Sequence, residues 1–269
     1  LGKVENKGLD FSIDYVKRFN KDFDMSFKGT FTYAHNKVLE YDEPDFQKYP
    51  NISREGHSVD QQLLYIAERL FIDDSEVQRN PKQNLGGWVS GGDIKYKNLP
   101  DVNGNYDNVI DSNDRQYTGM PTTPEIVYGF GPSFRYKKFD FSFFFQGAAR
   151  VSIMMNGIHP FGAEGTRNVL QFIADDYWSE TNQNIYAEYP RLSKRDNENN
   201  TKASTYWQRN GAFLKLKNLE VGFNHKFFRV YLRGSNLLTF SPFKYWDPEM
   251  GSGSGLSYPT QRVFNVGVQ

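Results

Sequence analysis

The sequence predicts an all-β protein, an antiparallel transmembrane β-barrel with long extracellular loops. Three observations indicate this fold: apolar and polar residues alternate in many segments, short and long connections alternate between those segments, and aromatic residues make up 16% of the chain. Alternation with a period of two places one set of side chains on each face of a strand. In a transmembrane barrel the apolar face contacts lipid between girdles of aromatic residues, short turns lie in the periplasm, and long loops lie outside the cell.

Period-two alternation recurs from the start of the chain to its end. In one segment Phe139, Phe141 and Phe143 alternate with Asp140 and Ser142. About nine segments reach roughly the ten residues that a tilted strand needs to cross a bilayer. The predicted strands are residues 5–19, 23–33, 58–72, 85–97, 126–136, 139–146, 211–224, 228–233 and 261–269.

The predicted strand 211–224 contains a change of phase. The apolar residues pass from even to odd positions, with Leu214 and Leu216 followed by Leu219, Val221 and Phe223. A β-bulge inserts one extra residue into a strand and so corrects such a change. We therefore expect a bulge near Lys217 and Asn218, which would keep the apolar residues on a single face.

Short and long connections alternate between the predicted strands. The tight turns are residues 20–22, 137–138 and 225–226, and the long segments are residues 37–57, 98–123, 152–206 and 240–260. The pair 58–72 and 85–97 is joined through the acidic residues 73–77, which we expect to form one helical turn. If the last strand descends toward the periplasm, all four long segments lie outside the cell.

The composition excludes several classes of protein. Lys+Arg and Asp+Glu both number 32, so there is no basic excess of the kind that binds nucleic acid. No apolar run is long enough for a membrane-spanning helix, and the absence of Cys excludes disulfides and thiolate sites. The chain starts at Leu1 without a signal peptide, and single-chain bacterial barrels use even strand numbers, so we expect further strands before Leu1.

Ten short segments along the chain occur together in a characteristic order. They are VENKGLDF at 4–11, GDIKYK at 92–97, DVNG at 101–104, IDSNDR at 110–115, FDFS at 139–142, FFQG at 144–147, FLKLKNL at 213–219, YLRGSNLL at 231–238, DPE at 247–249 and PTQR at 259–262. Together they resemble SusC- and RagA-like TonB-dependent outer-membrane transporters of Bacteroidota, and the resemblance covers essentially the whole chain.

The resemblance implies that residues 1–269 are the carboxy-terminal part of a 22-stranded, plugged barrel, without its plug domain. It implies a multi-pass protein of the Gram-negative outer membrane that imports oligosaccharides or peptides and is not an enzyme. The implied partners are a SusD-like surface lipoprotein, TonB through the absent amino-terminal region, the remaining barrel strands and membrane lipids. A dimer of transporter–lipoprotein pairs is also implied, and nucleic acid is not.

The residues alone leave two other functions open. One is a non-transporting barrel subunit or scaffold in a larger outer-membrane assembly. The other is a soluble β-rich domain that binds or hydrolyses carbohydrate. No nucleophile elbow or phosphate-binding loop is present in the sequence, so no catalytic residues are predicted.

The segment 101–114 is rich in Asp and Asn and carries a glycine, Gly104. Calcium takes six to eight oxygen ligands, which closely spaced carboxylates and amides supply. No cofactor is required, and a structural Ca²⁺ is the candidate ion. Its predicted ligands are Asp101, Asn103, Asp107 and Asp114, although the spacing departs from an EF-hand. The alternative is a turn in which Asp and Asn side chains cap their own backbone.

The longest segment, 152–206, is the candidate surface for a partner. The apolar spacing of 166–178 predicts a short amphipathic helix, and a charged stretch follows at 191–202. This mixture suits a polar protein interface, and the alternative is a self-packed loop that fills the outer vestibule. Trp207, Tyr245 and Trp246 are candidates for substrate contact or for packing within the loops.

Overall fold

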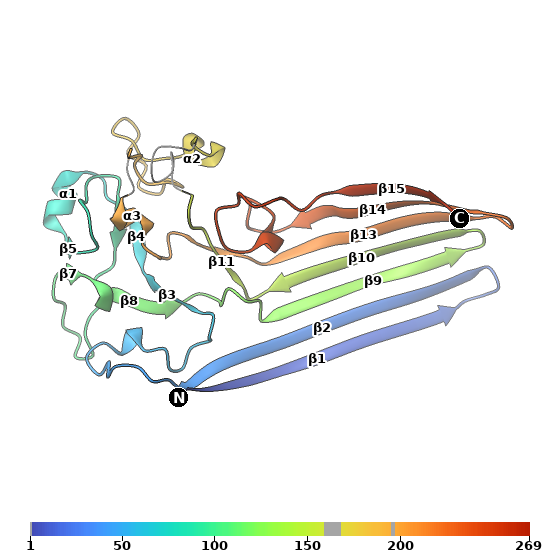
Figure 1. Cartoon of the computed structure of the whole chain (residues 1–269), viewed down its shortest axis with the longest axis horizontal. Coiled ribbons are helices and arrows are strands. Elements are labelled where there is room, and N and C mark those ends of the chain that lie inside the picture. Colours follow the sequence, from blue (N-terminus) through green and yellow to red (C-terminus); the bar gives the residue numbers. More distant parts are fainter. Residues whose placement is uncertain (1, 159–167, 195–196) are drawn as a thin grey trace.

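The computed structural model describes residues 2–158, 168–194 and 197–269. In these ranges the chain forms one long antiparallel sheet, with a compact group of short elements at one end of it (Figure 1). None of the helices in the described ranges has the length and apolar composition needed to cross a membrane.

Seven strands form the large sheet in the described part of the chain. They are β1 (Lys3–Arg18), β2 (Phe23–Glu40), β9 (Ile126–Tyr136), β10 (Phe139–Ala149), β13 (Phe213–Asn224), β14 (Arg229–Phe240) and β15 (Val263–Val268). Their order in the sheet is the same, and each pairs antiparallel with the next. The sheet is open in this chain, with β1 and β15 at its edges.

The register places the alternating apolar residues of all seven strands on one face. Opposed residues share a face in an antiparallel pair, and Phe31 is opposite both Phe11 and Tyr128. Phe223 is likewise opposite Phe139 and Val230. The same register places Phe23, Phe27, Phe31, Phe139, Phe143, Val230 and Leu232 on this one face, as the period-two alternation of the sequence predicts.

The predicted bulge in β13 is also confirmed. Between β10 and β13 the register shifts so that Phe144 is opposite Asn218 and Phe145 is opposite Leu216. Lys217 is the extra residue, and the pairing of β13 with β14 shifts at the same place. The bulge keeps Leu214 and Leu216 on the face that carries Leu219 and Val221.

The prediction of about nine crossing strands is wrong by one pair. Residues 58–72 and 85–97 contribute only the short strands β3 (Gln62–Tyr65), β4 (Ala67–Leu70) and β6 (Ile94–Tyr96), which lie outside the large sheet. Leu64, Leu70 and Ile94 are all 0% exposed, so these residues pack in a core instead of on a two-faced strand. Residues 41–125 therefore form one long segment, and the long segments number three in place of the expected four.

We call the elements of the three long segments 41–125, 150–212 and 241–262 the outer unit. All three segments leave the sheet at the same end (Figure 1). This agrees with the predicted side of the long segments, because removing two predicted strands, an even number, leaves the direction of every later strand unchanged. The other strands of this unit are β5 (Lys82–Gln83), β7 (Val109–Ile110), β8 (Arg115–Thr118), β11 (Ser152–Met154) and β12 (Gln208–Asn210). Its helices are α1 (Asp74–Arg79), α2 (Gln171–Asp175), α3 (Glu198–Thr201), and the 3₁₀ turns η1 (Pro50–Ile52), η2 (Ser112–Asp114) and η3 (Pro248–Met250).

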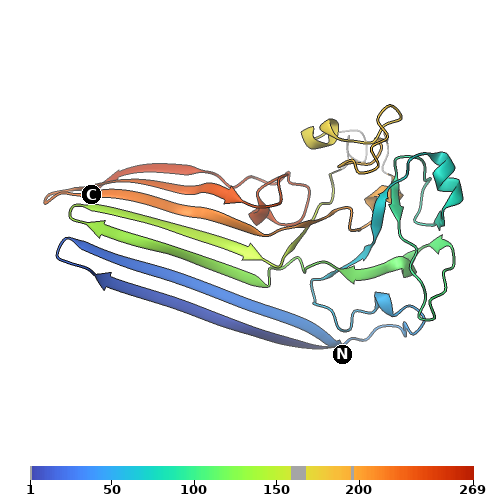
Figure 2. The ribbon, with the colours of Figure 1, turned by 180° about the vertical axis from the view of Figure 1, so that it is seen from behind.

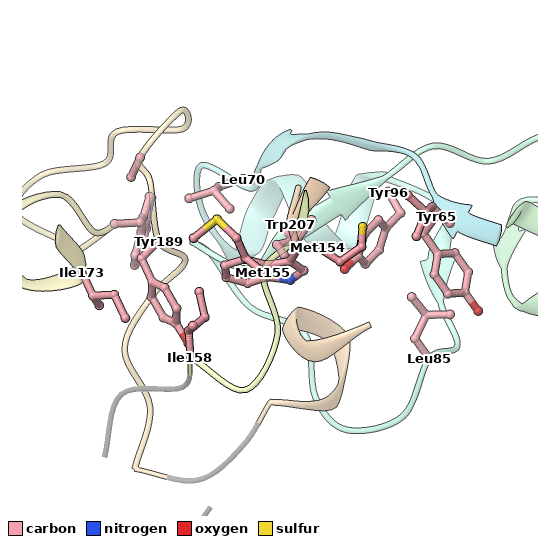
Figure 3. Close-up of a cluster of buried hydrophobic side chains, with 14 of the residues drawn as sticks. Tyr65, Leu70, Leu85, Tyr96, Met154, Met155, Ile158, Ile173, Tyr189 and Trp207 are labelled. Carbon is pink, nitrogen blue, oxygen red and sulfur yellow. The ribbon is translucent and has the colours of Figure 1, made fainter. Parts of the chain in front are cut away.

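The outer unit has a hydrophobic core of its own (Figure 3). Leu70, Tyr96, Ile153 and Trp207 are buried in it, so the core joins the first two long segments. A buried polar network also joins these segments.

In this network the carboxylate of Asp93, which is fully buried, accepts hydrogen bonds from Asn200 and Arg191 at 2.9 and 3.0 Å. The Asn200 side-chain oxygen accepts a bond from the Ile94 N–H. Buried polar groups fix a unique arrangement only when they are paired in this way.

Two helical predictions are confirmed in the outer unit, one of them only in part. The acidic residues 73–77 contain the start of α1, and the Asp73 carboxylate caps it by accepting a hydrogen bond from the Glu76 N–H. The helix expected at 166–178 is the shorter α2, whose Ile173 is fully buried. Residues 166 and 167 lie outside the described residues.

Candidate functional site

Three hollows in the outer unit converge on one side chain, Arg209. The first has a volume of about 230 Å³ between residues 67–69, 185–188 and 205–209. The second, of about 450 Å³, lies between Glu188, residues 209–210 and residues 242–245. The third, of about 550 Å³, reaches back to residues 149–152 above β10. The first two also share Glu188, so Glu188 and Arg209 form the wall between them.

Local structure holds Arg209 at this junction. β12, which contains Arg209, pairs with β11 directly above the ends of β10 and β13. The guanidinium donates to the Tyr206 carbonyl at 2.5 Å and to a Glu188 carboxylate oxygen at 3.2 Å. It also lies 5.8 Å from the centre of the Tyr245 ring. These contacts fix the planar group without burying it fully.

Glu188 receives hydrogen bonds on one of its carboxylate oxygens. That oxygen, Oε2, accepts from Arg209 and from the Tyr245 hydroxyl. Burial, followed by the neighbouring Glu188 carboxylate, raises the pKa of the Tyr245 hydroxyl, which therefore remains a donor. A carboxylate and a guanidinium side by side offer an acceptor and donors together. The arrangement can bind hydroxyl or amide groups of a polar ligand.

The three aromatic residues singled out from the sequence differ in their surroundings. Trp207 is 5% exposed, and its ring N–H donates to the Asn200 carbonyl, so it belongs to the core. The Trp246 ring N–H donates to the Gly251 carbonyl within its own loop. Of the three, only Tyr245 lines one of the hollows that meet at Arg209. Sequence reasoning missed Glu188 and Arg209, which are 21 residues apart and belong to no local motif.

The third long segment is fastened to the polar face of the sheet. The ammonium group of Lys215, on β13, is 2.6 Å from the Asp247 carboxylate and 2.5 Å from the Glu249 carboxylate. The Lys215 side chain is only 1% exposed. Burial raises the pKa of Asp247, but the hydrogen bonds from Lys215 and from the Glu249 N–H, together with the Lys215 charge, outweigh burial and lower that pKa overall. The pairs hold residues 242–245, which line the second hollow, over the outer end of the sheet.

The predicted calcium ligands lie in a loop closed by its own hydrogen bonds. The Asp101 carboxylate accepts from the N–H groups of Asn103 and Asn105, both at 2.9 Å, and these bonds keep its pKa below the usual value. Asp107 accepts from the Val109 N–H at 3.0 Å.

Asp114 is buried, and its two oxygens accept from the N–H groups of Leu99 and Asp111. Burial raises its pKa despite these bonds. Among the described residues no group of three or more His, Cys, Asp or Glu side chains is placed to hold a metal ion. Calcium binding by this loop stays a prediction.

Comparison with known proteins shows which proteins the chain resembles. No protein-family model matches it. Over its whole length it is 27% identical to TonB-dependent receptor P3 of Formosa agariphila and 24% identical to TonB-dependent receptor SusC of Bacteroides thetaiotaomicron. Along its whole length the chain is therefore similar to SusC-like receptors. It spans 29% and 26% of the length of these two relatives.

Solved structures confirm the fold of the SusC-like chain. The RagAB peptide transporter matches 99% of it with a TM-score of 0.68 at 22% identity, and the chain covers 29% of that structure. The RagAB peptide importer in its open-open state matches 100% with a TM-score of 0.67 at 21% identity.

These comparisons also confirm two simpler predictions. TonB-dependent receptors of this kind are outer-membrane proteins of Gram-negative bacteria, and the organisms of both relatives belong to Bacteroidota. The relatives themselves are named as receptors and importers and not as enzymes.

Proposed function

We propose that the SusC-like chain is the carboxy-terminal barrel portion of a TonB-dependent transporter that imports oligosaccharides or peptides across the outer membrane. The observation that supports this most directly is the two-faced sheet, with its continuous apolar face and with every long segment at one end. A transmembrane barrel needs this separation of lipid-facing and lumen-facing side chains. The whole-length similarity to TonB-dependent receptors supports the same role.

In this proposal each part of the chain has a separate task. The apolar face contacts lipid, and the polar face lines the passage. The outer unit contributes the hollows beside Glu188 and Arg209, in which part of the cargo binds before it enters the barrel. Energy reaches the transporter through TonB and a plug, neither of which this chain supplies.

The uptake experiment uses cells that carry the full-length gene or a deletion of it. Labelled oligosaccharides and labelled peptides are supplied separately, with and without a protonophore that abolishes the inner-membrane proton gradient. We expect import of one class only in gene-carrying cells, and loss of that import with the protonophore. Surface binding that is never followed by import would instead favour the non-transporting scaffold.

A matched pair of variants tests the hollows themselves. Glu188→Gln keeps the shape of the side chain but leaves the Arg209 guanidinium without its carboxylate partner. Binding of the imported cargo should weaken by about tenfold, the worth of one charged hydrogen bond. Glu180→Gln, an exposed residue of the same segment, is the control. Equal affinities for both variants and the parent would show that the cargo does not use these hollows.

A SusD-like surface lipoprotein is the partner that we propose for the outer unit, in an assembly that can hold two such pairs. Deleting 180–202 would be a poor test, because Ala187 and Tyr189 are buried and Arg191 pairs with buried Asp93. Tyr186 is 74% exposed and can be changed without opening the core. Tyr186→Asp should lower recovery of the lipoprotein with the full-length protein, whereas Glu180→Gln should not. If neither change affects recovery, the lipoprotein rests on another surface.

A further inference from the structure

The short-turn end of the sheet carries a concentration of cationic side chains. Three turns connect strands there, at residues 19–22, 137–138 and 225–228. The exposed cations in and beside these turns are Lys17, Arg18, Lys21, Lys137, Lys138 and Lys226. No ion pair joins any of the six to another described residue, and Asp22 is the one acidic residue within the three turns. We call these six side chains the cationic rim.

The three turns of the rim touch one another. The Lys137 N–H donates to the Asp22 carbonyl at 2.6 Å, which joins the first turn to the second. The Asn224 N–H donates to the Lys138 carbonyl at 2.6 Å, which joins the second turn to the start of the third. Figure 2 shows the turns side by side at the end of the sheet opposite the outer unit. The rim is therefore a continuous patch of unpaired positive charge.

Aromatic rings lie directly beside these cations. Phe19 stacks on Phe23 with the ring centres 5.0 Å apart, and Phe139 packs on Phe223 at 5.2 Å. Phe23, Phe139 and Phe223 are on the apolar face, so they form a row along its edge. Aromatic side chains in such a row are typical of the boundary between lipid tails and headgroups.

Three of the lysines reach over aromatic rings at this boundary. The ammonium groups of Lys17, Lys137 and Lys226 lie 5.0, 5.3 and 5.5 Å from the ring centres of Phe19, Tyr136 and Phe227. A lysine can lay its alkyl stem along apolar surface and keep its charge at the polar interface. These cations are thus held at the depth of lipid headgroups.

The charge of the rim is opposite to that of the other end of the molecule. The chain as a whole is neutral, but segment 41–125 of the outer unit contains fifteen Asp and Glu against eight Lys and Arg. The positive charge at the turns is therefore not a general property of the surface. A partner that meets only this end, at the edge of the apolar face, is a layer of anionic headgroups.

We propose that the cationic rim binds the phosphate headgroups of anionic phospholipids in the leaflet on the short-turn side. The proposal rests on the membrane-spanning role of the sheet but not on transport or on any cargo. Each lysine near an anionic bilayer surface strengthens binding several-fold. The contiguous turns would retain a ring of such lipids and set the height of the sheet in the membrane.

The experiment uses the full-length protein, purified in detergent with equal amounts of phosphatidylglycerol and phosphatidylcholine. Native mass spectrometry counts the lipids of each class that stay bound. The parent should retain phosphatidylglycerol preferentially. The triple variant Lys137→Gln, Lys138→Gln and Lys226→Gln should lower the ratio of phosphatidylglycerol to phosphatidylcholine by about tenfold or more.

Matched controls separate the rim from general charge effects. The triple variant Lys82→Gln, Lys97→Gln and Lys244→Gln removes the same charge from exposed lysines of the outer unit and should leave the ratio unchanged. Replacing the three rim lysines by Arg should preserve it and shows that the site tolerates substitution. An unchanged ratio in the rim variant, or equal losses in the rim and outer-unit variants, would overturn the proposal. So would displacement of the bound phosphatidylglycerol by an equal concentration of inorganic phosphate, which would indicate a site for soluble anions.

Discussion

Glu76 shows how one side chain can connect three elements of the outer unit. Its carboxylate accepts hydrogen bonds from Arg69 at 2.5 and 3.0 Å and from the Ile72 N–H at 2.8 Å. Lys95, from the neighbouring strand β6, lies 3.3 Å away. The Glu76 side chain is 11% exposed, so these charges are only weakly screened by solvent. One carboxylate thus ties helix α1 to strands β4 and β6.

This arrangement predicts an acid-sensitive outer unit. Burial raises the pKa of Glu76, but the bonds from Arg69 and Ile72 outweigh it and lower the pKa from 4.5 to about 2. A lowered pKa means that the stabilisation is complete above pH 4.5 and is lost as the pH falls toward 2. The shift corresponds to about 3 kcal/mol. The protection factors of the α1 amides, which are exchange rates corrected for the intrinsic pH dependence of exchange, should therefore fall across this range in the full-length protein.

Glu76→Gln provides the corresponding variant. It removes the charge and leaves Arg69 and Lys95 without their shared partner, so exchange at α1 should be fast already at neutral pH. The further loss of protection on acidification should then largely disappear. Glu180→Gln, in an exposed position, should behave like the parent protein. Slow exchange at neutral pH in Glu76→Gln would show that the ion pairs contribute little to this part of the fold.

At the scale of single elements, the bulge at Lys217 keeps the apolar residues of β13 on one face. Deleting Lys217 would place Leu214 and Leu216 in strict alternation with Leu219, so the same face would stay apolar without a bulge. Lys215 would remain on the polar face with its two carboxylate partners. We therefore expect the deletion to be tolerated, measured as a heat-modifiable band on electrophoresis like that of the parent. Deleting Ser142 from β10, which has no extra residue, would turn Phe143 and Phe145 to the polar face and should abolish that band. Loss of the band in the Lys217 deletion would show that the bulge itself is required.

The loop 101–114 is the element whose prediction stays open. Asp101 and Asp107 each have one carboxylate oxygen that accepts backbone N–H bonds, which is the geometry of an Asx turn. If the loop binds calcium, Asp101→Asn together with Asp107→Asn should weaken the affinity by at least about tenfold, because two anionic ligands are neutralised. Calorimetric titration of the full-length protein measures this, with Asp42→Asn and Asp45→Asn as the control. If the parent protein shows no heat of calcium binding, the loop is an Asx turn that binds no calcium.

The sequence predicted correctly those strands in which the alternation of apolar and polar residues has a single physical cause. In β2 and β10, alternation arises because one face meets apolar surroundings and the other meets polar ones, and the bulge at Lys217 is visible as a change of phase. Residues 58–72 have a similar local pattern, but Leu64 and Leu70 are buried among residues from distant segments. Packing in a core and exposure to lipid both favour apolar residues, so the pattern alone could not distinguish them. The contact between Glu188 and Tyr245, 57 residues apart, could not be predicted because no local pattern of residues encodes it.

On the scale of the whole molecule, the sheet and the outer unit have opposite surroundings. The sheet exposes large apolar side chains such as Leu9, Phe11 and Leu232, which a folded water-soluble domain would bury. The outer unit instead buries its apolar side chains in a core and exposes acidic residues. Apolar surroundings must therefore cover the sheet, while water surrounds the outer unit. A lipid bilayer that spans the height of the sheet and ends below the outer unit provides both surroundings.

This view predicts opposite effects for the same new side chain on the two faces of one strand. Phe143 lies near the middle of β10 on the apolar face, and the adjacent Ser142 lies on the polar face at nearly the same depth. Phe143→Arg should destabilise the full-length protein in lipid vesicles by about 2–4 kcal/mol, the cost of a cation near the bilayer midplane. Ser142→Arg places the charge opposite Glu220 and should cost little. Reversible urea unfolding in vesicles measures both changes. Equal destabilisation by the two variants would mean that the apolar face packs against protein and not against lipid.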